Sequence, residues 1–199
     1  MKRLALLAVV ATLAAGAQAV NLFYSGDTTG GSTWNRPLSM TGLSGVGTAV
    51  SYHVQEFHVT VSGNYEFEVF GTTHPDTYIF LYQGAFDPNN QFVGLVGGDD
   101  DFSSSFTMLS DNGGIGGGFN SSKMGGGTGD FGDQGVAMTA GVSYFAVVTG
   151  FGNGDAGEFN AAIGNGQGDV IAGAVPEPTT MAIFGLGAAA LAARKRRKS

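Results

Sequence analysis

Apolar and polar residues alternate through the middle of the chain. β-branched and aromatic residues dominate residues 52–61 and 65–70, and they alternate with polar residues from 56 to 61 and from 65 to 69. A period of two is typical of strands with one face toward a core and one toward water. Ser62, Gly63 and Asn64 separate the two runs, so the pattern predicts a β-hairpin with an exposed polar face.

The same pattern predicts more strands further along the chain, over residues 77–82, 91–96, 135–139, 143–149 and 157–163. No helical period of useful length lies between the two ends. Short strands separated by turn residues predict an all-β fold, an antiparallel β-sandwich of jelly-roll type.

A glycine-rich stretch interrupts the strands. Residues 111–135 hold eleven glycines in twenty-five positions. Such a segment buries too little apolar area to offset the entropy lost on ordering. We expect a flexible surface loop within the domain.

The N-terminus has the three parts of a secretory signal peptide. Met1–Arg3 is basic, Leu4–Ala15 is almost purely apolar, and Ala17 and Ala19 form a small-x-small cleavage site. Residues 1–19 are therefore predicted to form a signal helix that directs the chain to the Sec translocon. The mature protein should begin at Val20.

A second apolar run lies near the C-terminus. Met181–Ala193 is thirteen residues without a charge, against the ~20 needed to span a bilayer core. A basic stop follows it, consisting of Arg194, Lys195, Arg196, Arg197 and Lys198. The pattern predicts a single transmembrane helix with its tail in the cytoplasm, too short and too rich in glycine and alanine for a good permanent anchor.

The order of parts at this end carries a family resemblance. Val175, Pro176, Glu177 and Pro178, then a short apolar helix and a basic cluster, resemble the PEP-CTERM sorting signal of bacterial exported proteins. The resemblance implies that residues 175–199 are recognised and cut by an exosortase-type membrane protease. The protein would then occupy the inner membrane transiently and reach the cell surface or the extracellular space. A plain tail anchor is the alternative.

Charge separates the domain from its two ends. Residues 20–174, of a length that suits one domain, hold two basic side chains, Arg36 and Lys123, against fifteen acidic ones, a formal charge of −13. Such a surface repels nucleic acid and anionic membrane and attracts divalent cations. Cysteine is absent, so the domain has no disulfide.

One acidic group has the composition of a calcium site. Asp99, Asp100 and Asp101 follow Gly97 and Gly98, expected to form a turn, and Asp76 opens a predicted strand. Calcium takes six to eight oxygen ligands, and a bound cation would relieve repulsion among adjacent carboxylates. A solvated acidic turn is the other interpretation.

The strand rhythm across residues 51–166 carries a second resemblance. The segments Asp76–Tyr82, Phe86–Pro88, Asp99–Asp101 and Gly141–Val148 resemble those of pre-peptidase C-terminal β-sandwich domains. These are non-catalytic accessory modules of secreted bacterial proteins. The glycine-rich stretch departs from that pattern.

The sequence does not favour an enzyme. The histidines, His53, His58 and His74, lack metal spacing and are expected at surface positions; the carboxylates of Glu56, Glu66 and Glu68 are expected on exposed hairpin faces without a cleft. No nucleophile elbow, phosphate loop or zinc helix is found.

The leading interpretation is a non-catalytic protein of the cell surface or extracellular matrix. The alternative is an accessory module that binds extracellular polysaccharide or another polymer, with calcium as a possible stabiliser. Exposed aromatic residues would then make the contacts, with Trp34, Tyr78 and Tyr82 as candidates.

Overall fold

The computed structural model describes residues 19–102, 118–125 and 136–176. Within those ranges the chain is all-β, and every strand pairing is antiparallel. One sheet has the order β1 (Leu22–Asp27), β10 (Glu158–Gly164), β4 (Gly63–Gly71) and β7 (Ser121–Met124), with β8 (Val136–Met138) also beside β4. The other has the order β11 (Val170–Ala172), β3 (Val50–Val59), β9 (Tyr144–Gly150), β5 (Thr77–Gln83) and β6 (Leu95–Asp99), with β2 (Thr33–Trp34) beside β3.

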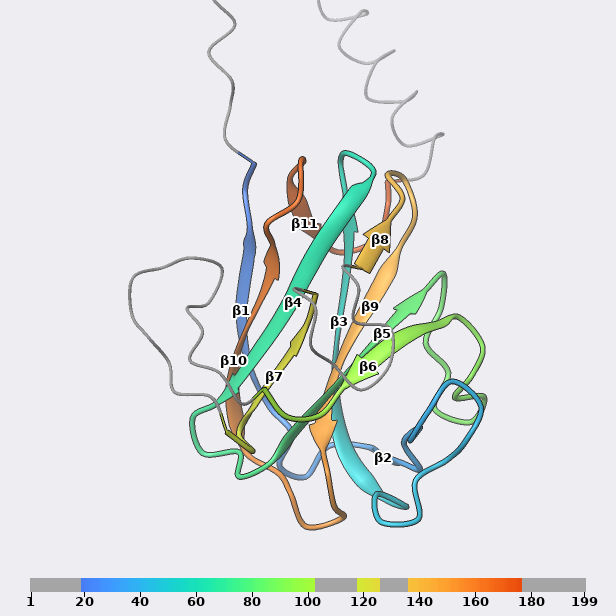
Figure 1. Cartoon of the computed structure of the whole chain (residues 1–199), viewed down its shortest axis with the longest axis vertical. Helices are drawn as coiled ribbons and strands as arrows, with labels where there is room; N and C mark the ends of the chain where they lie inside the picture. The colour runs from blue at the N-terminus through green and yellow to red at the C-terminus, as the bar shows by residue number, and fades with distance from the viewer. Residues whose placement is uncertain (1–18, 103–117, 126–135, 177–199) are drawn as a thin grey trace, which may run out of the picture.

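The two sheets lie against each other (Figure 1), and side chains from both form one hydrophobic core. Phe57, Ile79 and Val148 enter it from the second sheet, and Phe67 and Phe159 enter it from the first; all five are buried. Inward side chains alternate with outward ones along these strands, as expected for two sheets packed face to face. No helix among the described residues is long and apolar enough to cross a membrane.

The predicted hairpin of residues 52–70 is wrong, although both of its strands exist. β3 pairs with β9 and β11, whereas β4 pairs with β10, β7 and β8, so the chain passes from one sheet to the other between them. Each strand faces its apolar residues inward, Phe57 and Val59 from one sheet and Tyr65 and Phe67 from the other. Alternation specifies a buried face but not the partner strand, which is why the sequence could not separate the two arrangements.

A second apolar cluster covers the other face of β5. Tyr78, Phe80 and Tyr82 pack there with Trp34, whose ring meets those of Phe80 and Phe86 edge-on at 5.3 Å each. β5 is therefore buried on both faces, which explains its continuous apolar run. The prediction that Trp34, Tyr78 and Tyr82 are exposed is wrong, since they are only 4, 1 and 0% exposed.

The strand predicted over residues 91–96 begins later than expected. Residues 91–94 form a turn, in which the Val93 amide donates to the Asn90 carbonyl, and β6 starts at Leu95. Gly97 and Gly98 lie inside β6 rather than in a turn. A Cβ on Gly98 would stand 2.6 Å from the Phe80 ring, so glycine lets this ring pack against the strand.

Part of the glycine-rich segment is ordered, contrary to the loop prediction for 111–135. Its central residues Ser121–Met124 form β7, which pairs with β4, and the Met124 side chain is fully buried in the shared core. Four residues with few apolar side chains give too little period for a sequence-based strand prediction. The rest of the stretch, 111–117 and 126–135, lies outside the described residues.

The remaining predicted strands are confirmed with small shifts at their ends, as β5, β8, β9 and β10. β1, β2 and β11 were not predicted. The predicted signal helix and transmembrane helix lie in residues 1–18 and 177–199, outside the part of the chain that the structure describes.

Candidate functional site

Three of the four predicted metal ligands meet at one end of the second sheet. A carboxylate oxygen from each of Asp76, Asp100 and Asp101 lies within 4.8 Å of the others. The sheet register explains this, because Ile79 of β5 stands opposite Asp99 of β6, so the residue before β5 and the residues after β6 come together. We call these three residues the acidic cluster.

Asp99 does not belong to the acidic cluster. It is the last residue of β6, almost fully buried, and its Oδ2 accepts a hydrogen bond of 2.7 Å from the Lys123 amide of β7. Asp99 still belongs to the strand and faces β7, whereas Asp100 and Asp101 follow the end of the strand, where the backbone is free to turn both toward Asp76. Asp99 instead links β6 of one sheet to β7 of the other.

The Asp76 carboxyl lies in a strongly perturbed electrostatic environment. Burial raises the pKa of its carboxyl from 3.8 to about 6; the carboxylates of Asp155 and Asp101 add to the rise, and the Arg36 guanidinium opposes it. Its Oδ1 is enclosed by protein and receives no hydrogen bond. A hard cation would supply the missing partner, because carboxylate oxygens are the ligands that calcium takes.

Arg36 holds the neighbouring loop in place. Its side chain is fully buried, donates from Nε and Nη2 to the Phe151 carbonyl at 3.0 and 2.9 Å, and lies over the Tyr78 ring at 4.1 Å. The Phe151 amide in turn donates to the Asp76 carbonyl at 3.3 Å. From the sequence, Arg36 was predicted only to contribute charge; the available signal for an internal role is that residues 20–174 contain just two basic side chains.

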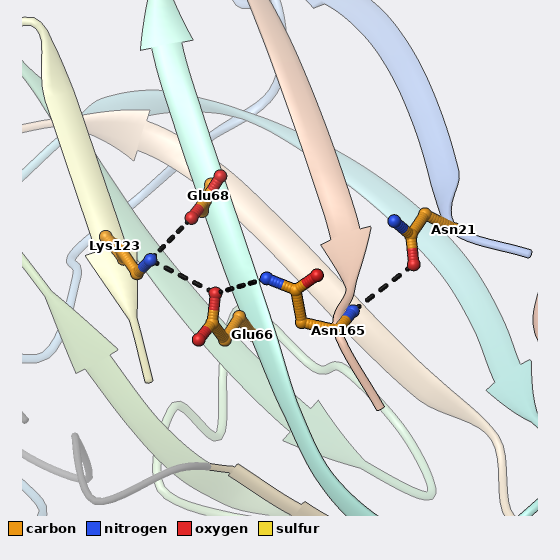
Figure 2. A network of polar contacts seen from close by, with 5 residues as sticks. All are labelled: Asn21, Glu66, Glu68, Lys123 and Asn165. Carbon is orange, nitrogen blue, oxygen red and sulfur yellow. Dashed lines mark hydrogen bonds and ion pairs between the residues drawn. The ribbon is translucent and has the colours of Figure 1, made fainter. Parts of the chain in front are cut away.

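The glutamates that the sequence grouped together are separated by the fold. Glu56 lies on β3 of the second sheet, whereas Glu66 and Glu68 lie on β4 of the first and both pair with Lys123 (Figure 2). The distances from Lys123 Nζ are 3.1 Å to Glu66 and 2.6 Å to Glu68, which is fully buried rather than exposed. Burial alone would lower the pKa of Lys123, but hydrogen bonds and charge from the two carboxylates outweigh it and raise the pKa.

Asn165 extends this network to the N-terminal end of the domain. Its side-chain amide donates to Glu66 Oε2 at 2.9 Å, and its backbone amide donates to Asn21 Oδ1 at 3.2 Å (Figure 2). Asn165 has a positive φ of 56°, which asparagine tolerates better than most residues. The ion pairs are made within the protein, and the group links β4, β7 and the loop after β10.

The expectation of surface histidines is wrong for His58 and His74. Both are buried; His58 Nδ1 lies 3.0 Å from the Gly173 carbonyl, and both ring nitrogens of His74 lack a hydrogen-bond partner. Burial lowers the pKa of His74, which therefore stays neutral near pH 7. His53 is half-buried between the sheets and stacks on Tyr24.

The described part of the C-terminal signal ends at Pro176. Val175 and Pro176 follow β11 at the surface, and the Val175 amide lies 3.4 Å from Ser143 Oγ. At the other terminus Ala19 is described. The other predicted signal residues, Ala17, Glu177, Pro178 and the basic stop Arg194–Lys198, lie outside the described residues.

Comparison with known families identifies the C-terminal segment alone. Residues 174–197 match the PEP-CTERM protein-sorting motif. A search of curated proteins gives no match. The motif implies a protein that is exported and passes the membrane before an exosortase processes it.

Proposed function

We propose that this chain is a non-catalytic protein of the cell surface or extracellular matrix, delivered there by its C-terminal sorting signal. The observation that carries the proposal is the motif at residues 174–197, joined within a few residues to a folded β domain. An exosortase would cut near residues 175–178, removing the basic stop. The acidic domain would then leave the membrane.

The tail provides the direct test. In the native host, intact mass of the surface-located protein should show a C-terminus near residues 175–178. Replacing Pro176, Glu177 and Pro178 together by alanine should leave the basic tail on the protein. A surface-located, unsubstituted protein that still ends in Ser199 would contradict processing and leave a plain single-pass anchor.

The finer fold assignment is part of the proposal. Two antiparallel sheets with a shared core are consistent with a jelly-roll-like sandwich and with the pre-peptidase C-terminal resemblance. Modules of that kind act without catalysis. Hydrolytic screening of the purified domain against glycan, ester and peptide substrates should accordingly find no turnover.

Saccharide binding is a second candidate function. Because Trp34, Tyr78 and Tyr82 are buried, a different surface would have to make the contacts. An open groove of about 650 Å³ lies across β1 and β10, lined by Ser25, Gly26, Asp27, Thr72, Glu158, Phe159 and Asn160. Ser25 Oγ donates to Asn160 Oδ1 at 2.7 Å, and Phe23, 52% exposed, lies two positions before Ser25 along β1. Hydroxyl, amide and carboxylate groups beside an exposed ring suit a neutral, polyhydroxylated ligand.

A glycan array with the domain tests this candidate. Binding should weaken on Asn160→Ala and on Phe23→Ala. The matched control is Phe92→Ala, which removes an exposed ring from the turn before β6 of the other sheet. Absence of any glycan signal, or equal loss in all three variants, would remove the groove as the contact surface.

We also propose that calcium stabilises the acidic cluster. Support comes from the three converging carboxylates and from the enclosed, unpartnered oxygen of Asp76. Titration calorimetry of residues 20–174 should show saturable calcium binding in the millimolar range or tighter, lost in Asp76→Asn and Asp101→Asn. Asp87→Asn, in an exposed turn where Asn89 and Asn90 already bind the carboxylate, is the control. A flat titration would assign the cluster to a solvated acidic turn.

A further inference from the structure

Both ends of the domain leave the sandwich at the same place. β1 and the three-residue strand β11 both begin at one end of the molecule (Figure 1), and residues 173–176 remain beside it, where the Val175 amide lies 3.4 Å from Ser143 Oγ. Two hydrogen bonds of 2.9 Å tie them there, from the Val170 amide to the Val20 carbonyl and from the Val20 amide to Asp169 Oδ1. The predicted signal peptide and the sorting signal are therefore attached to one end, which we call the tail-bearing end.

The connection between the domain and the sorting signal is short. The Gly173 amide donates to the Glu56 carbonyl at 2.7 Å, and the Gly173 carbonyl lies 3.0 Å from His58 Nδ1. Pro178 follows Gly173 by only five residues. Fully extended, five residues reach at most about 17 Å, so an enzyme that holds this motif comes within that distance of the folded domain.

The tail-bearing end differs in charge from the opposite end. Its loops, residues 60–62, 139–143 and 164–169, and the chain segments 20–21 and 173–176 contain one charged side chain, Asp169; the adjoining loop 84–94, whose Gly84 amide donates to the Ser143 carbonyl, adds Asp87. Strands that run away from it lead to the segments 27–33, 72–76, 99–101 and 150–158. Those segments hold seven acidic residues, namely Asp27, Asp76, Asp99, Asp100, Asp101, Asp155 and Glu158.

We propose that the tail-bearing end is a docking surface for the membrane protease that cuts the sorting signal. The inference rests on the proposed function and adds a second recognition surface to the motif itself. The short connection places this end against the protease. Its loops carry few charges, so they can approach another polar protein surface while burying little unpaired charge, whereas the acidic end would bury several charges.

Glutamate substitutions on the two ends of the full-length chain test this surface. Val61 and Gln167 are exposed on the tail-bearing end, and Thr29 and Ser32 are exposed on the opposite end. Loss of the basic tail is followed over time by mass spectrometry in the native host. Val61→Glu with Gln167→Glu should slow processing roughly fivefold or more, because a charge buried at an interface lacks a partner. Thr29→Glu with Ser32→Glu adds the same charge and should process at the original rate.

A longer connection separates docking from folding defects. Ten Gly and Ser residues between Gly173 and Ala174 add a flexible span of roughly 17 Å, so the domain need no longer touch the enzyme. The insertion should restore processing to the slow double variant. Failure to restore it, or equal rates for the two double variants, would overturn the docking surface.

Two further results distinguish the remaining explanations. Val61→Lys with Gln167→Lys should also slow processing, because a lysine buried against a protease surface would also lack a partner. Faster processing would instead indicate that anionic lipid headgroups contact this end of the domain, and it would overturn the proposal. An unsubstituted chain that is never processed contradicts the proposed function, whereas normal processing with indifferent surface variants contradicts only this inference.

Discussion

Single buried charges in this domain depend on particular partners. Glu68 is enclosed on the outer side of β4 and Lys123 reaches it at 2.6 Å, while Arg36 is enclosed beside the Asp76 carboxyl. Lys123 and Arg36 are the two basic side chains of residues 20–174, and both make their contacts within the domain. Each basic side chain stabilises the fold by neutralising a carboxylate that folding has already removed from water.

Removing the lysine should therefore destabilise the domain. Lys123→Met leaves the Glu68 carboxylate buried beside Glu66, and the free energy of unfolding should fall by about 3 kcal/mol. Urea denaturation at pH 7 measures this. The double variant Lys123→Met with Glu68→Gln should recover part of the loss; an equal or larger loss would mean that packing of the lysine stem, not charge, is responsible.

The raised pKa of Asp76 predicts a particular pH dependence. A carboxyl that binds its proton more tightly in the folded state stabilises the fold at low pH, and this contribution is lost as pH rises from about 3.8 to about 6. Without calcium, the Tm should fall between pH 4 and pH 6.5 by less in Asp76→Asn than in the original domain. Millimolar calcium should offset the loss at pH 6.5 and have little effect at pH 4. If the Tm of the two proteins fell equally over this pH range, the pH-dependent loss of stability could not be assigned to Asp76.

At the scale of elements, β7 shows how a weak segment becomes ordered. Ser121–Met124 has no apolar period, yet it extends the first sheet beside β4 and adds Met124 to the core. Ser122 strengthens this placement, because its hydroxyl donates to the Thr77 carbonyl at 2.8 Å, across to the other sheet. Neighbouring elements, rather than local propensity, form this strand.

If β7 is part of the core, shortening its buried side chain should be costly. Met124→Ala should lower the free energy of unfolding by about 2–5 kcal/mol, the usual range for such a cavity. Phe119→Ala, at an exposed position two residues before β7, should change it by no more than about 0.5 kcal/mol. Equal, small effects in thermal denaturation would mean that β7 is not stably packed.

At the scale of the whole molecule, charge and chain ends are distributed unevenly. The acidic residues concentrate at the end away from the termini, and the termini are tied to each other beside Asp169. Under the proposed function, this arrangement would direct the most repulsive surface away from the membrane before the sorting signal is cut.

Removal of the signal peptide should strengthen the junction between the two ends. A cut after Ala19 turns the Val20 amide into an ammonium 2.9 Å from Asp169 Oδ1. Asp169→Asn should then lower the free energy of unfolding by about 0.5–1 kcal/mol in a chain that begins at Val20. The loss should be smaller in a chain with extra residues before Val20, and it should shrink at high salt. Equal losses in both chains would show that the charge has no part.

The negative charge of the mature domain also predicts that it does not bind nucleic acid. With a formal charge of −13, residues 20–174 should give no mobility shift with duplex DNA or RNA even at about 50 mM salt. A shift that weakens with added salt would reveal a basic surface that the charge count hides.

Sequence alone determined the class of fold, the position of most strands and the nature of the C-terminal signal. Alternation over residues 52–61, 65–70 and 157–163 depends on local periodicity, and the sorting motif is a linear pattern, so neither needs distant contacts. Both can therefore be recognised without a structure.

Tertiary structure decided which strands pair and which charged groups meet. The apolar patterns of β3 and β4 are equally satisfied by one hairpin or by two sheets, and only the packed core selects the second. Asp76 joins Asp100 and Asp101 while Asp99 turns away, because sheet register and strand alternation place their side chains. Glu68, Trp34 and Tyr78 are buried because other segments of the chain pack over the outward face of each strand. The sequence of the strand itself does not show which segments will pack there.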